Sequence, residues 1–252
     1  MAVIWNHTLR KSIGIVISIS KAVDIVVGFG VCPDTSDPKL VKIIVDEITS
    51  MWEVDAFTLN TRVWKIVYTS VPFKWGEFSW LQVFVIGVIY FHAYDSICLF
   101  DDGGRSNFVI SFDLKSEKFG EVCLPERLVH APLLRETKVN ESLGLLEYFD
   151  EGEMSLCGVW TRKDGANKSF TKIYTIKVEC KSLYGRVLGF RNNGEVVMEL
   201  DDDNYEKARI EVYEPLSGHI NGVGINGKRL TFSARSYMET LLLLNETDSI
   251  IH

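Results

Sequence analysis

The sequence predicts an all-β fold of the β-propeller class with about five blades. A unit of strand, polar turn and strand recurs along the chain, and its central aromatic residues are separated by 52, 55, 48 and 53 positions: Trp5, Phe57, Phe112, Trp160 and Tyr213. Each repeat of about fifty residues holds about four short apolar runs divided by turn residues, which is typical of a propeller blade rather than of a solenoid. No segment shows a long amphipathic period of 3.6 residues, so helix is expected to be scarce.

The clearest copy of this unit lies at residues 107–126. An alternating strand ends near Leu114, a polar turn region runs from Asp113 to Lys118, and a second strand begins at Phe119. The second strand places a large residue seven positions after the central one in three copies and ten positions after it in a fourth: Phe112 and Phe119, Phe57 and Trp64, Tyr213 and Ile220, Trp160 and Phe170. This recurrence predicts core packing for five aromatic residues: Trp64, Phe112, Phe119, Trp160 and Tyr213.

The first half of the chain continues as hairpins. Residues 25–31 and 40–48 form a hairpin across the turn sequence CPDTSDPK, and residues 54–67 form the second copy of the unit. Residues 69–81 are a long connection that carries several aromatic side chains, and connections of this length are often functional. Residues 82–94 then form two short strands with a tight turn at Gly87.

The second half of the chain continues with the same units of strand, turn and strand. Residues 141–163 form two strands around an acidic turn, and residues 208–225 form the last copy of the unit after an acidic loop at 201–207. Residues 186–200 carry Asn193-Gly194 between apolar runs, which predicts a hairpin with a type I′ turn because both central positions of that turn need a positive φ.

Residues 235–244 carry several leucines, but the repeat register predicts a strand rather than a helix. Such a strand would open another unit, whose central strand has no place later in the chain. It can instead lie beside the strand of Trp5 and complete one blade from both chain ends. Ring closure of this kind hides edge strands, which would otherwise be open to pairing.

Composition restricts the function classes. A chain of 252 residues with 46% hydrophobic and 24% charged residues is expected to form one domain, 1–252. The net charge of −7 argues against nucleic-acid binding, which needs a surplus of Lys and Arg on one face. No stretch reaches the roughly 18 uninterrupted apolar residues of a membrane helix, so no membrane partner is expected.

The five cysteines indicate a reducing compartment, cytoplasmic or nuclear. They are scattered and form no CxxC pair, so we expect small apolar core residues rather than zinc ligands or disulfides: Cys32, Cys98, Cys123, Cys157 and Cys180. The run Ile13–Ile19 after Arg10 and Lys11 imitates a signal sequence, but Lys21 and Asp24 interrupt the apolar stretch. The four N-x-S/T triplets are of a kind that occurs often by chance.

The chain also resembles a known family, the plant F-box-associated (interaction) domain. The matching stretches cover nearly the whole chain in family order: IWNHTLRKS, VVGFGVCPDTSDPKLVKII, VDAFTLNTRVWKIV, QVFVIGVIYF, VISFDLKSEKFGEVCLPE, LCGVWTRKDGANKSFTKIYTI, VLGFRNNGEVVMEL, VYEPLSGHINGVGI and SYMETLLLL. His7 replaces the usual Pro after the WN dipeptide, and Phe91 stands where Trp is common. The F-box and the strand pair that usually precede the WN strand are absent, so we expect a fragment or a truncated relative, incomplete at the N-terminus.

The resemblance implies a kelch-like β-propeller that recognises target proteins for an SCF-type E3 ubiquitin ligase. It implies that the ligase adaptor binds only if an F-box is supplied. The alternative is a kelch-like propeller that binds a carbohydrate or a metal, or acts as an enzyme, and it would need His, Asp or Glu side chains that converge on one face.

The motifs of catalysis and cofactor binding are missing from the sequence, so no catalytic, cofactor-binding or metal residue is predicted. The five histidines are dispersed, Gly28-x-Gly30 lacks the third glycine of a dinucleotide fingerprint, and Asp201 to Asp203 lack the glycine and distal glutamate of a calcium loop. The acidic run is better explained as a solvated hairpin loop.

Three aromatic residues are the predicted partner-binding residues: Trp75, Phe78 and Trp80. They lie in the 69–81 connection and have no counterpart in the other repeats. Two interpretations remain open, because aromatic residues of this kind form either inter-blade packing or an exposed recognition patch.

Overall fold

The computed structural model describes residues 1–17, 24–46, 51–68, 77–95, 106–163, 168–178, 186–201, 206–234, 243 and 249–251. This described part contains strands β1 to β19 and one four-residue helix, α1 (Glu126–Val129). The strands form five separate sheets. The predicted, nearly all-β fold with about five blades is therefore confirmed.

Four of the five sheets, here called blades, are continuous in sequence and antiparallel throughout. Blade 2 consists of β3 (Asp24–Val31), β4 (Pro38–Asp46), β5 (Met51–Thr58) and β6 (Val63–Tyr68). Blade 3 consists of β7 (Glu77–Val85), β8 (Val88–Asp95), β9 (Ser106–Asp113) and β10 (Lys118–Val122). Blade 4 consists of β11 (Leu133–Val139), β12 (Ser142–Glu151), β13 (Met154–Arg162) and β14 (Phe170–Lys177). Blade 5 consists of β15 (Val187–Phe190), β16 (Val196–Asp201), β17 (Lys207–Tyr213) and β18 (Ile220–Lys228).

Blade 1 joins the two ends of the chain. It contains β1 (Ala2–Asn6), β2 (Lys11–Ile15) and β19 (Ser249–Ile251), and β19 pairs in parallel with β2 rather than with the strand of Trp5. Closure from both ends is thus present, through β19 on β2; the predicted pairing of 235–244 with the Trp5 strand lies outside the described residues. Of the predicted strand 235–244, only Leu243 lies inside the described residues, where it is buried beside Ile4 and Ile13.

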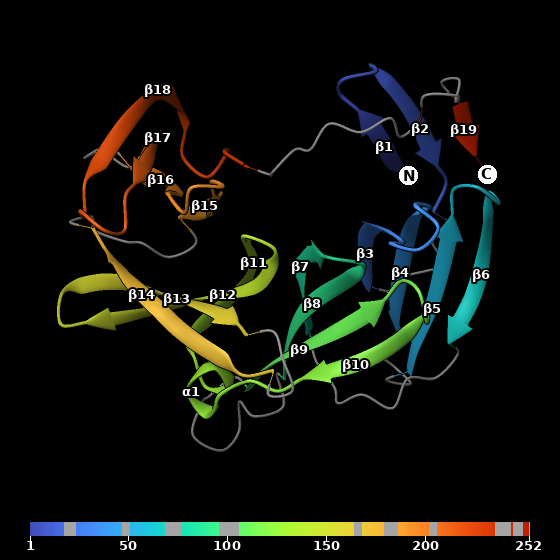
Figure 1. Ribbon diagram of the computed structural model, residues 1–252, viewed down its shortest axis with the longest axis horizontal. Helices are drawn as coiled ribbons and strands as arrows, with labels where there is room; N and C mark the ends of the chain where they lie inside the picture. Colours follow the sequence, from blue (N-terminus) through green and yellow to red (C-terminus); the bar gives the residue numbers. More distant parts are fainter. Residues whose placement is uncertain are drawn as a thin grey trace.

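The blades follow one another around a common centre (Figure 1). The first strands of successive blades contact each other, β3 with β7, β7 with β11 and β11 with β15, while β6, β10 and β18 lie further out. Four clusters of buried apolar residues each lie between two consecutive blades, as these pairs illustrate: Ile13 and Phe57, Ile43 and Phe91, Val109 and Leu145, Val159 and Met198. Each such side chain contributes about 1.5–3 kcal/mol of apolar burial.

The glycines of β3 permit this close packing of blade 2 on blade 3. A Cβ atom on Gly30 would lie 2.5 Å from Cδ2 of Phe84, and one on Gly28 would lie 2.7 Å from Cζ of Phe91. Any larger residue would push the first strand away from the neighbouring blade. Gly28-x-Gly30 is therefore a packing feature of the propeller centre.

The large residues of the repeat that are seven positions apart lie opposite each other on the third and fourth strands. Phe57 pairs with Trp64, Phe112 with Phe119 and Tyr213 with Ile220. The fourth copy differs, because its hairpin pairs Arg162 with Phe170, which leaves Lys172 opposite Trp160; a bulge follows between Trp160 and Val159. Phe112 and Tyr213 are buried, whereas Trp64, Phe119 and Trp160 are half-buried, so the core prediction is too strong for these three.

The hairpin at Asn193-Gly194 is confirmed, but its turn type is not. Only Gly194 has a positive φ, of 86°, and its N–H donates to the carbonyl of Arg191 at 2.9 Å. Arg191 N–H in turn donates to the carbonyl of Glu195 at 2.9 Å. This is a type I turn followed by a glycine in the left-handed region, the three-residue hairpin loop, rather than type I′.

Candidate functional site

One turn conformation recurs between β1 and β2 and between the third and fourth strands of blades 2, 3 and 5. Its last residue has a positive φ in four copies: Arg10 (52°), Arg62 (56°), Glu117 (55°) and Gly218 (72°). In three of them the N–H of this residue donates to the carbonyl four positions earlier, at 2.8–2.9 Å. Since the left-handed region is costly for residues other than glycine, the blades impose this turn on the chain.

A side chain at the start of the turn stabilises this conformation by accepting hydrogen bonds from its backbone. In the turn 114–117, Oδ1 of Asp113 accepts hydrogen bonds from the backbone N–H groups of Ser116 at 2.6 Å and Lys115 at 3.1 Å. The bond from Ser116 is the main cause that holds the pKa of Asp113 below its usual value. The turn is therefore rigid and presents the side chains of Lys115 and Glu117 in fixed positions.

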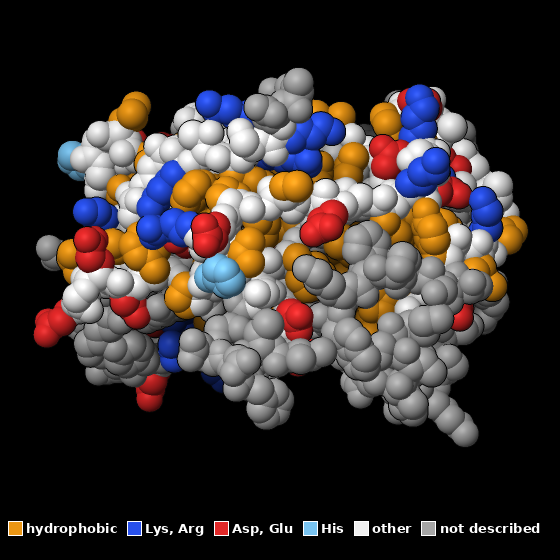
Figure 2. All heavy atoms as spheres, turned by 90° about the horizontal axis from the view of Figure 1, so that it is seen from below, with side chains coloured by type: hydrophobic (Ala, Val, Ile, Leu, Met, Phe, Trp, Pro, Cys, Tyr) orange, Lys and Arg blue, Asp and Glu red, His pale blue; other side chains and the backbone are white. Residues whose placement is uncertain are grey.

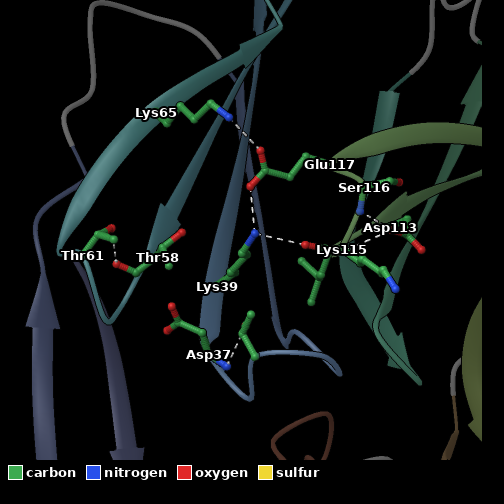
Figure 3. Close-up of polar contacts among 11 residues, drawn as sticks. Asp37, Lys39, Thr58, Thr61, Lys65, Asp113, Lys115, Ser116 and Glu117 are labelled. Carbon is green, nitrogen blue, oxygen red and sulfur yellow. Dashed lines mark hydrogen bonds and ion pairs between the residues drawn. The ribbon is translucent and has the colours of Figure 1, made fainter.

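An ionic network joins this turn to blade 2 (Figure 3). Lys39 Nζ of β4 donates to Glu117 Oε1 at 2.7 Å and to the Leu114 carbonyl at 3.0 Å. Lys65 Nζ of β6 donates to the other oxygen of Glu117 at 3.0 Å. Burial opposes ionisation of Glu117, but the hydrogen bonds from both lysines outweigh it and lower its pKa.

Three further turns lie against this one. Asp37 Oδ1 accepts from the N–H of Asn60 at 3.1 Å, which ties the turn 32–37 to the turn 59–62. The carbonyl of Gly87 accepts from Leu114 N–H at 2.9 Å, and a Cβ on Gly87 would lie 2.7 Å from the ring of Pro33. We call the combined surface of residues 32–37, 59–62, 86–87 and 114–117 the turn face.

The turn face exposes apolar and charged side chains together. Ile86 is 65% exposed, and Val63, which directly follows the turn 59–62 at the start of β6, is 59% exposed. The ion pair between Lys115 and Asp34, at 2.6 Å, is also open to solvent. A rigid surface of this composition suits contact with another protein, because little conformational entropy is lost when a partner binds it.

The three predicted aromatic residues are only partly described. Trp75 lies outside the described residues, and β7 begins at Glu77, so Phe78 and Trp80 belong to a strand and not to the connection as predicted. The ring of Phe78 packs on Trp52, with centroids 4.8 Å apart, and lies 6.4 Å from the ring of Phe91. This side chain takes part in packing between blades 2 and 3, and a role of the three residues in partner binding stays a prediction.

His92 and Asp201, whose residue types could bind a metal, contact other protein side chains instead. His92 is buried, its Nε2 donates to Asn107 Oδ1 at 3.0 Å, and burial lowers its pKa to about 4. Asp201 ends β16 and pairs with Arg186 and Arg229, so it is not a solvated loop residue; Asp202 and Asp203 lie outside the described residues. No group of three or more metal-ligating side chains occurs within the described ranges.

The cysteines divide into two groups. Cys32 and Cys157 are buried, as predicted, and burial raises the pKa of the Cys157 thiol to about 12. Cys123 is exposed, contrary to the prediction, and the other two lie outside the described residues. Within the described part, no helix is both long enough and apolar enough to span a membrane.

Fold and surface together define a propeller scaffold that presents rigid turns. The chain belongs to the F-box associated beta propeller domain family, whose model matches residues 1–241. A protein of Arabidopsis thaliana named as a putative F-box protein is 30% identical over 120 residues, which are 46% of this chain and 35% of that protein. The chain thus matches only about a third of the length of this relative.

Solved structures show more distant likeness. An oligogalacturonate lyase in complex with manganese matches 88% of this chain and 58% of its own, with 11% identity and a TM-score of 0.48. TolB from Acinetobacter baumannii matches 80% of this chain and 43% of its own, with 12% identity and a TM-score of 0.45. At these values neither structure bears on function.

Proposed function

We propose that this chain is the target-recognition module of an F-box protein and holds a target protein for ubiquitination by an SCF-type ligase. The observation that carries the proposal is the family match over residues 1–241. The rigid turn face, with exposed Ile86 and Val63 beside charged side chains, supports a protein as the ligand. The module binds and does not catalyse, takes no cofactor, and works in the cytoplasm or nucleus.

The ligase adaptor is a partner only through an F-box on the same polypeptide. The kelch-like alternative, a carbohydrate- or metal-binding propeller or a propeller enzyme, needs converging His, Asp or Glu side chains. No observation on the described residues favours it over target recognition.

The proposal is tested by joining this chain to an F-box. The chain is fused to the F-box of a relative and expressed in cells, and ubiquitinated peptides are quantified by mass spectrometry. The controls are the F-box alone and a fusion that carries Ile86→Ser and Val63→Ser, two exposed changes that should leave the fold intact. We expect a small set of proteins to gain ubiquitin with the fusion only, and less with the variant; identical ubiquitination with the fusion and with the F-box alone would refute the proposal.

Adaptor binding is measured separately by calorimetry. The fusion should bind the adaptor, and the chain alone should show no association at micromolar concentration. Tight binding of the chain alone would place adaptor contacts in the propeller.

A further inference from the structure

Blade 4 carries a second ionic cluster, which the turn face does not include. Glu147 of β12 is buried, and its Oε1 accepts a hydrogen bond from Nε of Arg127 in α1. Its Oε2 accepts from Nε1 of Trp160 in β13 at 3.0 Å and lies 4.0 Å from Nζ of Lys172 in β14. One carboxylate therefore holds side chains from a helix and two strands.

An aromatic ring lies between the two cations. The guanidinium of Arg127 lies 5.1 Å and Nζ of Lys172 lies 4.9 Å from the centroid of Phe149, and Nζ is also 5.9 Å from that of Trp160. These separations fall within the range of cation–π attraction. We call these four residues, Arg127, Phe149, Trp160 and Lys172, the cation–aromatic patch.

The cations of the patch keep donors available. Arg127 uses Nε for Glu147, and across the described ranges its two Nη atoms donate to no protein group. Lys172 Nζ reaches Glu147 only at 4.0 Å. The side chain of Arg127 is 55% exposed and that of Lys172 is 30% exposed, so both head groups can meet a ligand from solvent.

A network of buried side chains holds α1, the helix that carries Arg127. Nδ2 of Asn107 donates to the carbonyls of Leu128 and Val129 at 3.2 Å and of Ala131 at 2.9 Å, and His92 holds the other end of the Asn107 amide. Glu136 Oε2 lies 3.8 Å from Nδ1 of His92 on the remaining side. This buried network positions α1, so the patch exists before any ligand binds.

From this geometry we propose that the cation–aromatic patch binds an acidic segment of the target protein, through one side-chain carboxylate next to an apolar side chain. Two cations and one carboxylate leave a net charge of +1, which matches one Asp or Glu better than a phosphate of about −1.5 to −2. Phe149 and Trp160 supply the contact for the apolar neighbour. Figure 2 shows Lys and Arg side chains next to hydrophobic ones in its left half, the side on which α1 and β12 to β14 lie in Figure 1.

The local charge is unusual for a chain whose net charge is −7. A positive patch on a protein of net negative charge favours the approach of an acidic segment at that place. This inference rests on the proposed function for the identity of the ligand as a target protein, but its test does not need ubiquitination.

The test selects a displayed library of random peptides of about twelve residues on the purified chain. The best peptide, its Asp/Glu→Asn/Gln version and its phosphoserine version are then titrated by calorimetry. The variants are Arg127→Gln with Lys172→Gln and, as a matched loss of two surface cations, Lys138→Gln with Arg191→Gln; thermal unfolding checks that both remain folded. The indole N–H resonance of Trp160, assigned with Trp160→Phe, reports binding at the patch.

We expect selected peptides to carry an acidic residue beside an apolar one and to shift the Trp160 resonance. Their Kd should rise about ten-fold or more in the patch variant and less than about two-fold in the matched control. Three results would overturn the proposal: no enriched acidic peptide, equal effects of the two variants, or a phosphoserine version that binds about ten-fold more tightly, which would indicate a phosphate site.

The same variants separate this inference from the proposed function. If the F-box fusion ubiquitinates its targets equally with and without Arg127→Gln and Lys172→Gln, target recognition stands and the patch is not part of it. If peptides bind the patch but the fusion ubiquitinates nothing, the patch stands and the ligase role fails.

Discussion

Glu117 and Glu147 each hold two cationic side chains, but they do so at different depths and between different elements. The side chain of Glu117 is 21% exposed and joins a turn of blade 3 to two strands of blade 2. That of Glu147 is 3% exposed and joins α1 to the strands of its own blade. One carboxylate and two cations thus connect two blades at Glu117. At Glu147 the same three kinds of charge lie on blade 4 and α1.

The difference lies in what the cations have left to donate. Lys39 donates to Glu117 and to the Leu114 carbonyl and is nearly buried, so it offers little to a ligand from solvent. Arg127 gives one nitrogen to Glu147 and keeps the outer two for solvent or a ligand. Both cations of the Glu147 cluster can therefore meet a ligand, whereas in the Glu117 cluster only Lys65 is largely exposed.

The largest contrast should appear when each carboxylate is removed. Glu147→Ala should lower the free energy of unfolding by about 3 kcal/mol, because the Trp160 indole loses its acceptor and a buried space is opened. Glu117→Ala should cost only about 1 kcal/mol, since Lys39 keeps its bond to the Leu114 carbonyl and Lys65 is exposed to water. Urea unfolding of both variants measures this, and equal costs would mean that burial does not distinguish the two clusters.

A smaller effect isolates the indole hydrogen bond. Trp160→Phe should cost about 1.5–2 kcal/mol, because it removes a bond to a charged acceptor. Trp64→Phe is the matched control: Trp64 is also half-buried, packs on Phe57 and has a cation over its ring (Lys42, 5.2 Å), but its indole N–H has no acceptor in the described part, so the cost should stay below about 1 kcal/mol. If the control costs as much, ring size rather than Glu147 stabilises Trp160.

The backbone at Glu117 provides a third comparison. Glu117→Gly should be about 0.5–1 kcal/mol more stable than Glu117→Ala, because φ is +55° and glycine adopts this region without strain. Gly218 already occupies the equivalent position in blade 5. Thermal unfolding of the two variants measures the difference, and a more stable alanine variant would contradict the strain argument.

The pH dependence of the turn face should be the smallest effect. The pKa of Glu117 in the folded chain lies below its ordinary value of 4.5, so its stabilisation is complete above that value and is lost as the pH falls through the folded pKa. The free energy of unfolding of the wild type minus that of Glu117→Gln should be constant from about pH 7 to about pH 5 and shrink below about pH 4.5. A difference that grows on acidification would show that the lysines do not favour the charged form.

Local rules made much of the fold predictable. Two strands joined by a turn of four residues place positions seven apart directly opposite each other, which is why the offset from Phe57 to Trp64 and from Phe112 to Phe119 identified real cross-strand pairs. Asn193-Gly194 also identified a hairpin, because these two residues favour tight turns, although the predicted type I′ turn was wrong. The sequence alone thus predicted the blade-forming units, a count of about five, and the family, whereas the exact count came from the structure.

The two ionic clusters were decided only by tertiary structure. Lys39 and Glu117 are 78 positions apart and meet because blades 2 and 3 pack with their turns together. Lys172 lies opposite Trp160 because β13 continues to Arg162, which pairs with Phe170, so the long loop between β13 and β14 sets a register that differs from that of the other copies. Periodicity carries information only between neighbours in one hairpin, whereas the orientation of one blade on the next, and the path of α1 between two of them, depend on the packing of the whole ring.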